Sequence, residues 1–207
     1  MKQQTIFRCT NCDSQFPKWT GRCVVCGQWN TLVEERFQAA SAAPGKVASK
    51  PSLLTAVLVA DTQRMSTGSL DIDQLLGGGE RNQGLVAGSL VLLGGDPGIG
   101  KSTLALQWAL HTANSGSLTL YVSGEESLPQ IKLRAERLGE DLGRLQVLSE
   151  NNLETVLATI EATKPRFAVI DSIQTMYTQG ASGVAGGVAQ VSYATARILE
   201  LCKTRQV

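Results

Sequence analysis

Four cysteines near the start of the chain, Cys9, Cys12, Cys23 and Cys26, form two Cys-x-x-Cys pairs separated by ten residues. Each pair can wrap one side of a tetrahedral ion, and the residues between the pairs can form the turn that joins them. Four thiolates that leave no open position are typical of a structural zinc site rather than a catalytic one. A redox dithiol pair and unrelated buried cysteines are the alternatives. We predict zinc, whose binding contributes on the order of 10 kcal/mol to the folding of so small a module.

Three other residues bear on this interpretation. Trp19 and Trp29 flank the second cysteine pair. In so small a module we expect their rings to cover the metal site, and stacking on a base or contact with a partner protein is the alternative. Cys202 stands alone in a predicted helix and is expected to be a core thiol.

A phosphate-binding pattern lies in the middle of the chain. The stretch GDPGIGKS, residues 95–102, fits G-x-x-x-x-G-K-[ST] between an apolar run and a helical pattern. Its glycines let backbone N–H groups converge on phosphate oxygens, and the following helix directs its positive end at the same charge. We expect Lys101 to reach the β- and γ-phosphates, Ser102 to bind Mg²⁺ and Thr103 to support the α-phosphate. The predicted nucleotide-contacting set is Gly95, Asp96, Pro97, Gly98, Ile99, Gly100, Lys101, Ser102, Thr103 and Asp171.

Carboxylates follow two of the apolar runs. Asp171 ends one of them, where it can complete the Mg²⁺ shell, often through water. Hydrolysis also needs a base for the attacking water. Carboxyl ends of parallel strands meet at one ligand crevice, so we predict Glu125 as this base, with Glu126 as its helper. Simpler alternatives are a solvent-exposed acid at Asp171 and an acid pair that favours a helix N-terminus at 125–126. Ser172 is a weaker candidate for sensing the γ-phosphate.

The elements that would position these residues alternate along the chain. Apolar runs of strand length lie at 89–95, 117–124, 145–149 and 166–173. Helical spacing is found at 102–115, 128–139, 153–164 and 187–204. Alternating strands and helices predict an α/β fold whose mostly parallel sheet has helices on both faces.

Changes in composition divide the chain of 207 residues. We predict a zinc finger over 1–33, a linker over 34–52 and a nucleotide-binding core over 53–207. The linker is rich in Ala, Ser, Pro and Gly and is expected to be flexible, with a partly helical tail of the zinc finger as the alternative. The chain ends with RQV after a helix, like the start of a further strand, so we expect a C-terminally truncated core.

Composition excludes few classes of partner. The start of the chain lacks the apolar segment of a secretory signal, and LLTAVLVA at 53–60 is far too short to span a membrane. We therefore expect a cytoplasmic protein without a membrane partner, whose thiols stay reduced. The formal net charge of +1 indicates no strong basic patch, so charge alone does not predict nucleic-acid binding.

The motifs together resemble one family. The stretches CTNC, PKWTGRCVVCGQWNT, MSTGSLDIDQLLGGG, LLGGDPGIGKSTLALQ, YVSGEES, QIKLRAERLG and VIDSIQT resemble the RadA (Sms) family of bacterial DNA repair proteins, which are RecA-type ATPases. The resemblance covers nearly the whole chain except the linker. It implies a RecA-like P-loop core behind a zinc finger, with ATP, Mg²⁺ and Zn²⁺ as cofactors. By the same resemblance, the four cysteines are the zinc ligands and Glu125 is the base.

The resemblance also implies an activity. Members of the family are DNA-dependent ATPases, so the resemblance implies this activity here. It also implies assembly as a homo-hexamer, binding of single-stranded and branched DNA, and promotion of branch migration in recombination. A recombinase is the implied partner, and a replicative helicase is a further candidate. Residues 179–190, QGASGVAGGVAQ, occupy the place of the first DNA-binding loop, although this stretch has no Lys or Arg.

Some features depart from the family pattern. The Lys-Asn-Arg-Phe-Gly motif and the Lon-protease-like domain of family members are missing here, so the activity of this chain by itself is left open. The turn at 77–89 is longer than usual. Two other functions stay open: another RecA-fold ATPase, of the replicative-helicase or clock type, and an adaptor switched by ATP.

Overall fold

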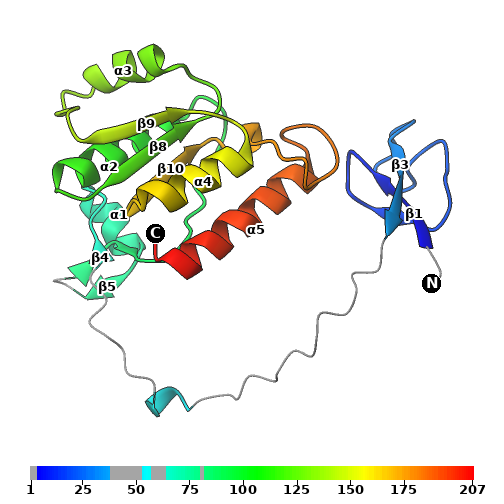
Figure 1. The fold of residues 1–207 in the computed structure, drawn as a ribbon, viewed down its shortest axis with the longest axis horizontal. Helices are drawn as coiled ribbons and strands as arrows, with labels where there is room; N and C mark the ends of the chain where they lie inside the picture. The colour runs from blue at the N-terminus through cyan, green and yellow to red at the C-terminus, as the bar shows by residue number, and fades with distance from the viewer. Residues whose placement is uncertain (1–3, 38–52, 57–63, 80–81) are drawn as a thin grey trace. The chain divides into compact units, whose positions relative to one another are not determined.

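The computed structural model describes residues 4–37, 53–56, 64–79 and 82–207, which are drawn in colour in Figure 1. The chain divides into two compact units, a small N-terminal unit and a larger unit that contains the nucleotide loop. Most of the predicted linker, 38–52, lies outside the described residues. Between 53 and 63, only a short exposed 3-10 turn, η1 (Leu54–Ala56), and the residue before it are described.

The N-terminal unit is a three-stranded antiparallel sheet with two loops that carry the cysteines. Its strands are β1 (Gln4–Cys9), β2 (Gln15–Phe16) and β3 (Leu32–Phe37), in the order β2-β1-β3. The strand β3 pairs with the whole length of β1, so the sheet continues into the first residues of the predicted linker. A small core forms where Cys9, Cys23 and Leu32 are buried and Phe7 and Phe16 pack against them.

The two tryptophans do not cover this core. Trp19 is 56% exposed and Trp29 is 69% exposed, and neither belongs to the cluster around the cysteines. Phe7, Phe16 and Leu32 cover the cysteines instead, because β1, β2 and β3 direct them toward the thiols. The expectation that the tryptophans shield the metal site is therefore wrong.

The larger unit is built on a parallel sheet of three strands in the order β10-β8-β9. These strands are β8 (Thr119–Ser123), β9 (Leu145–Ser149) and β10 (Phe167–Asp171). The registers align Asp171 with Ser123 and Ser123 with Ser149, so all three strands end at one edge. Every residue of the central strand β8 is buried.

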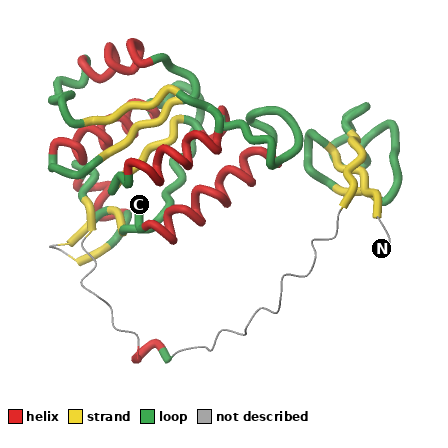
Figure 2. Tube along the Cα trace, viewed as in Figure 1, coloured by secondary structure: helices red, strands yellow, loops and turns green. Residues whose placement is uncertain are grey.

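Helices cover both faces of this sheet, as Figures 1 and 2 show. On one face, Tyr121 packs among buried residues of α2 (Lys101–Asn114) and α3 (Leu128–Glu136). On the other face, Leu120 and Val122 pack against α4 (Leu153–Thr163) and α5 (Val188–Arg205). Successive strand residues point to opposite faces, so a single strand supplies both cores. The predicted α/β fold with helices on both faces is confirmed.

Local signals explain where these helices begin and end. Helix α3 starts with a capping box formed by Ser127 and Gln130. Helix α4 starts at Asn152, whose side chain accepts a hydrogen bond from the backbone N–H of Thr155. It ends at Lys164, which adopts a left-handed conformation immediately before a proline. Cys202 of α5 is buried in the core, as predicted, and burial raises the pKa of its thiol.

Short elements precede the nucleotide loop. Helix α1 (Leu70–Leu75) lies between β4 (Arg64–Met65) and a turn region that contains β5 (Gly78–Gly79), β6 (Asn82–Gln83) and β7 (Leu85–Val86). Strand β4 pairs with β7, and β5 pairs with β6. The long turn predicted at 77–89 therefore contains one antiparallel pair, β5 with β6, and the strand β7, whose partner β4 lies outside the turn. Residues 80–81 lie outside the described part of the chain. None of the helices in the described parts of the chain is long and apolar enough to cross a membrane.

One predicted strand does not form. Residues 89–95 have no regular secondary structure, and Leu92 is 79% exposed. The run is apolar enough for a buried strand, but a strand also needs hydrogen bonds from a neighbour, and the sheet of the described residues ends at β10. The prediction of a first core strand at 89–95 is therefore wrong.

Candidate functional site

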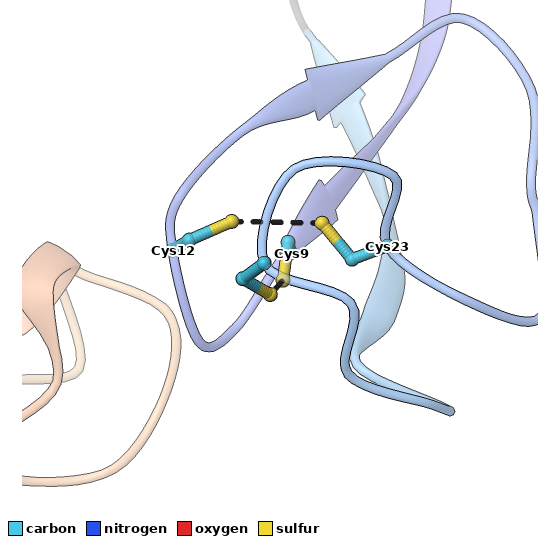
Figure 3. Close-up of side chains that lie close together, drawn as sticks. Cys9, Cys12 and Cys23 are labelled. Atoms are coloured by element: carbon cyan, nitrogen blue, oxygen red, sulfur yellow. Dashed lines mark hydrogen bonds between the residues drawn. The ribbon is translucent and has the colours of Figure 1, made fainter.

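The four cysteines of the N-terminal unit converge. Their sulfur atoms all lie within 4.8 Å of one another, and Cys9 Sγ lies 3.6 Å from Cys26 Sγ. Cys12 Sγ and Cys23 Sγ point toward one another at 3.5 Å (Figure 3). Four zinc–sulfur bonds of about 2.3 Å in a tetrahedron would place the sulfurs about 3.8 Å apart. The spacing and the chemistry of the four donors therefore fit one zinc ion.

The two cysteine loops have the same backbone geometry. The N–H of Asp13 donates to Cys9 O at 2.9 Å, and the N–H of Gly27 donates to Cys23 O at 2.8 Å. Both residues that follow the second cysteine of a pair have positive φ, 62° at Asp13 and 73° at Gly27. Each loop therefore turns back immediately after its second thiol, which directs both thiols of the pair to the same side.

The thiols are electrostatically unequal. Burial raises the pKa of Cys9, but hydrogen bonds with Thr31 and with backbone groups of Asn11 and Cys12 lower it to about 6. At Cys23, a backbone hydrogen bond from Cys26 lowers the pKa, yet burial and the neighbouring sulfur groups raise it to about 11. A divalent cation among the sulfurs would favour the thiolate form of every member of the cluster.

In the larger unit, the phosphate-binding pattern forms an open loop before α2. Gly98 and Gly100 have φ of 80° and 98°, and no atom lies within 4 Å of the place where a Cβ would stand on either. Gly100 is the N-cap of α2, so no side chain caps the first amides of this helix. Asp96, Pro97 and Ile99 are exposed along with the glycines. The backbone is therefore free to approach a phosphate closely.

Lys101 closes over this loop. Its Nζ donates hydrogen bonds of 2.8 Å to Gly95 O and to Asp96 O. The ammonium group is thus held at the loop by neutral carbonyls, which a phosphate would replace as the stronger, charged acceptor. Thr103 lies in the first turn of α2 and is half-buried.

Ser102 and Asp171 meet at the end of the sheet. Ser102 Oγ donates to Asp171 Oδ1 at 2.9 Å, although the two residues are 69 positions apart in the chain. A hydroxyl and a carboxylate side by side are oxygen donors that suit Mg²⁺. The structure therefore brings together the two residues predicted to hold this ion.

The two neighbouring glutamates differ in their surroundings. Ser172 Oγ donates to Glu125 Oε1 at 3.1 Å, which puts Glu125 beside the end of β10. Glu126 Oε2 instead lies 2.6 Å from Nη2 of Arg134, in an ion pair without hydrogen-bond geometry. Glu126 is thus neutralised by a cation, whereas Glu125 contacts a hydroxyl next to Asp171.

Two residues near Asp171 were missed by the sequence analysis, Tyr121 and Arg134. Tyr121 OH donates to Asp171 Oδ2 at 2.5 Å, and Arg134 Nη2 donates to Tyr121 OH at 2.8 Å. The signal that could have found Arg134 is its place on α3, next to buried Ala135 and one turn after buried Ile131. A guanidinium on the apolar side of a helix needs a buried acceptor.

The glycine-rich stretch at 179–190 is anchored by its last residue. Gln190 is fully buried in α5, and its amide accepts from the backbone N–H of Thr178 and donates to the carbonyls of Thr178 and Ala181. Thr178 in turn follows η2 (Ile173–Thr175), the turn that leads away from Asp171. DNA contact by this loop stays a prediction.

Both units of the chain match known protein families. Residues 80–203 match the family described as AAA domain, and residues 7–34 match the family described as rubredoxin metal binding domain. The chain is 41% identical to the DNA repair protein RadA of Bacillus subtilis over 100% of its own length, and 45% identical to that of Aquifex aeolicus over the same share. It is 44% identical to RadA of Pseudomonas aeruginosa over 98% of its length.

The chain spans 44% to 45% of the length of these three curated relatives. The resemblance to RadA expected from the motifs is thereby confirmed. The matched AAA domain covers more than half of the chain and includes the phosphate loop, Asp171 and both glutamates. With its phosphate loop, its Ser102–Asp171 pair and this match, the chain belongs to the AAA domain family.

Proposed function

We propose that this chain binds and hydrolyses ATP with Mg²⁺ at the end of the parallel sheet. The observation that carries the proposal is the meeting of four side chains there. Ser102 donates a hydrogen bond to Asp171. Ser172, the residue after Asp171, donates one to Glu125. A nucleotide loop, a pair of oxygen donors and a carboxylate base are the parts that phosphoryl transfer to water needs.

Each residue has a role in this proposal. The glycines at 95, 98 and 100 and the first amides of α2 cradle the phosphates, and Lys101 moves from the loop carbonyls to the β- and γ-phosphates. Ser102 and Asp171 hold Mg²⁺, which neutralises phosphate charge when it is bound. Glu125 orients the attacking water and accepts its proton, while Ser172 keeps the carboxylate near the γ-phosphate.

The N-terminal unit has a separate role. We infer that Cys9, Cys12, Cys23 and Cys26 hold a structural zinc ion. All four donors are thiols, and together they would fill the tetrahedral coordination sphere and leave no position for water or substrate. The four cysteines and the nucleotide loop belong to different compact units of the chain. We propose that the N-terminal unit docks a partner or transmits the nucleotide state, and that it takes no part in the chemistry.

The relatives support a role in DNA repair. Because proteins named DNA repair protein RadA match the chain over nearly all of its length, we propose an ATP-dependent motor of recombination. In this proposal a homo-hexamer binds single-stranded and branched DNA and promotes branch migration, with a recombinase or a replicative helicase as its partner. The loop at 179–190 is the candidate DNA contact.

Turnover of ATP by the purified protein, measured with and without single-stranded DNA, tests this proposal. We expect turnover that DNA stimulates, together with movement of the branch point in a synthetic three-strand junction. Turnover that is indifferent to DNA would favour a clock-type ATPase. A Glu125→Gln variant serves as the control, because it keeps the nucleotide loop intact and removes only the base.

One observation favours a second function, an adaptor that ATP switches between conformations. The loop at 179–190 contains no Lys or Arg, so it offers no side-chain cation to a phosphate backbone. Tight ATP binding without turnover, under conditions in which the zinc-bearing unit captures a protein partner, would favour the adaptor over the motor.

A further inference from the structure

A partly buried chain of contacts continues from Asp171 away from Ser102 and is not explained by the roles given above. Asp171 has both carboxylate oxygens engaged: Oδ1 accepts from Ser102, and Oδ2 accepts from Tyr121 OH. The first contact is on the side of the nucleotide loop. The second comes from the central strand β8, whose residue Tyr121 is fully buried.

The hydroxyl of Tyr121 is in turn held by Arg134. Nη2 of Arg134 donates to Tyr121 OH at 2.8 Å, and the guanidinium carbon lies 5.9 Å from the centre of the Tyr121 ring. The side chain of Arg134 is only 18% exposed. It therefore has few water positions available, and its charge must be balanced by protein groups.

Two carboxylates balance that charge. Arg134 Nη2 lies 2.6 Å from Glu126 Oε2 and 3.6 Å from Asp171 Oδ2. A single guanidinium on α3 thus contacts both the acid that follows β8 and the acid that ends β10. The other residue of the acidic pair, Glu125, accepts from Ser172 instead. The position of Arg134 accounts for the different surroundings of two adjacent glutamates.

We propose that Arg134 and Tyr121 are positioning residues of the nucleotide site. Tyr121 fixes the rotation of the Asp171 carboxylate so that Oδ1 faces Ser102. Arg134 orders the Tyr121 hydroxyl and holds Glu126 away from the base position, which leaves this role to Glu125. The inference rests on the proposed nucleotide function, and neither residue is expected to touch the nucleotide.

The sharpest variant is Tyr121→Phe, which removes one hydroxyl and keeps the ring that fills the core between α2 and α3. The affinity of the 207-residue chain for a fluorescent ATP analogue is measured with Mg²⁺ and again with EDTA. We expect affinity in Mg²⁺ to fall about tenfold and affinity in EDTA to stay within about twofold, because only the magnesium-binding pair loses its orientation. A residue that merely supports the fold would change both affinities alike.

Arg134→Met tests the second half of the proposal. Methionine is a good helix former of similar length, but it leaves Glu126 half-buried without its cation. We expect a lower melting temperature and the same selective loss of affinity in Mg²⁺. Adding Glu126→Gln should restore the melting temperature and leave the loss of affinity in place. Arg137→Met, at an exposed arginine at the end of the same helix, is the matched control and should change neither quantity.

The outcomes separate the two proposals. If the unsubstituted chain binds the analogue and Tyr121→Phe binds it equally well in Mg²⁺, the positioning role is wrong and the nucleotide site stands. If the Arg134→Met/Glu126→Gln double variant regains both the melting temperature and the affinity in Mg²⁺ of the unsubstituted chain, Arg134 has only a structural role. A chain that binds no analogue under either condition overturns the proposed function and this inference with it.

Discussion

Ser172 donates a hydrogen bond of 3.1 Å to Glu125, which joins the residue after Asp171 to the turn that follows the neighbouring strand. The contact crosses between the ends of β10 and β8, which are paired in parallel register from Phe167 to Asp171. Parallel strands that end together place the residues after them at one edge. A carboxylate and a hydroxyl from distant parts of the chain thereby lie beside Ser102 and Asp171, the pair proposed to hold Mg²⁺.

This geometry predicts different effects for the two glutamates. Glu125→Gln should retain ATP binding and reduce turnover by about a hundredfold or more, because a general base contributes on the order of 10²–10⁴ in rate. Glu126→Gln should reduce turnover far less, since its carboxylate is neutralised by Arg134. Single-turnover hydrolysis and nucleotide binding are measured for both variants. If Glu126→Gln loses turnover and Glu125→Gln keeps it, Glu126 is the base and Glu125 is not.

Lys101 is expected to be essential for nucleotide binding. Lys101→Ala removes the only ammonium group that contacts the loop carbonyls in the described part of the chain, so the phosphate charge would lose its closest cation. We expect affinity for ATP to fall at least tenfold and turnover to be lost. Lys132→Ala, at an exposed lysine of α3, is the control. Near-normal turnover in Lys101→Ala would contradict the phosphate-loop assignment.

Removal of the metal should affect the N-terminal unit alone. Elemental analysis is expected to find about one zinc per chain, and a chelator or Cys23→Ser should unfold this unit, because its core consists mainly of the cysteines and three apolar residues. Nucleotide binding should persist, while repair function in cells is lost. Cys202→Ala is the control: this cysteine is buried in the larger unit, so the variant protein should still bind one zinc ion in its N-terminal unit.

The zinc prediction has two ways to fail. A folded N-terminal unit that contains no metal would refute the site. Equal loss of nucleotide binding and repair function in Cys23→Ser would mean that this unit supports the fold of the nucleotide core and has no docking role.

Asp73 should make stability depend on pH. Burial raises the pKa of this carboxyl, but hydrogen bonds from Ser66 and Thr67, together with nearby His111, lower it below its usual value. The folded state therefore binds the proton more weakly than the unfolded chain. This stabilisation is present above the unfolded pKa of about 3.9 and is lost as the pH falls through the lower folded value.

The variant that tests this pH dependence is Asp73→Asn. It should lower the free energy of unfolding by about 2 kcal/mol at pH 7, and the difference from the unsubstituted chain should shrink below about pH 4. Denaturant unfolding at a series of pH values measures both effects. Asp71→Asn, at an exposed acid of the same short helix, is the control. A difference that stays constant down to the lowest pH would show that the charge of Asp73 does not matter.

Some features could be predicted from the sequence because their physical cause lies within a few neighbouring residues. The spacing of Cys9 and Cys12 brings two thiols to one side of a turn, and the glycines before Lys101 allow the backbone to curve ahead of α2. The periodicity of apolar residues predicted four helices and three of the strands near their observed positions. Local geometry and side-chain spacing were enough in these cases.

Other features depend on contacts between distant residues, and only the tertiary structure decided them. The apolar run at 89–95 has no strand partner, Trp19 and Trp29 stay exposed, and Glu126 pairs with a cation on the next helix. Nothing in the spacing of residues 125 and 126 distinguishes the two carboxylates. The distinction arises because α3 packs on the sheet with Arg134 turned toward Tyr121 and Asp171. The sequence shows which charged side chains are present, whereas the packing of helices on the sheet determines which of them form ion pairs.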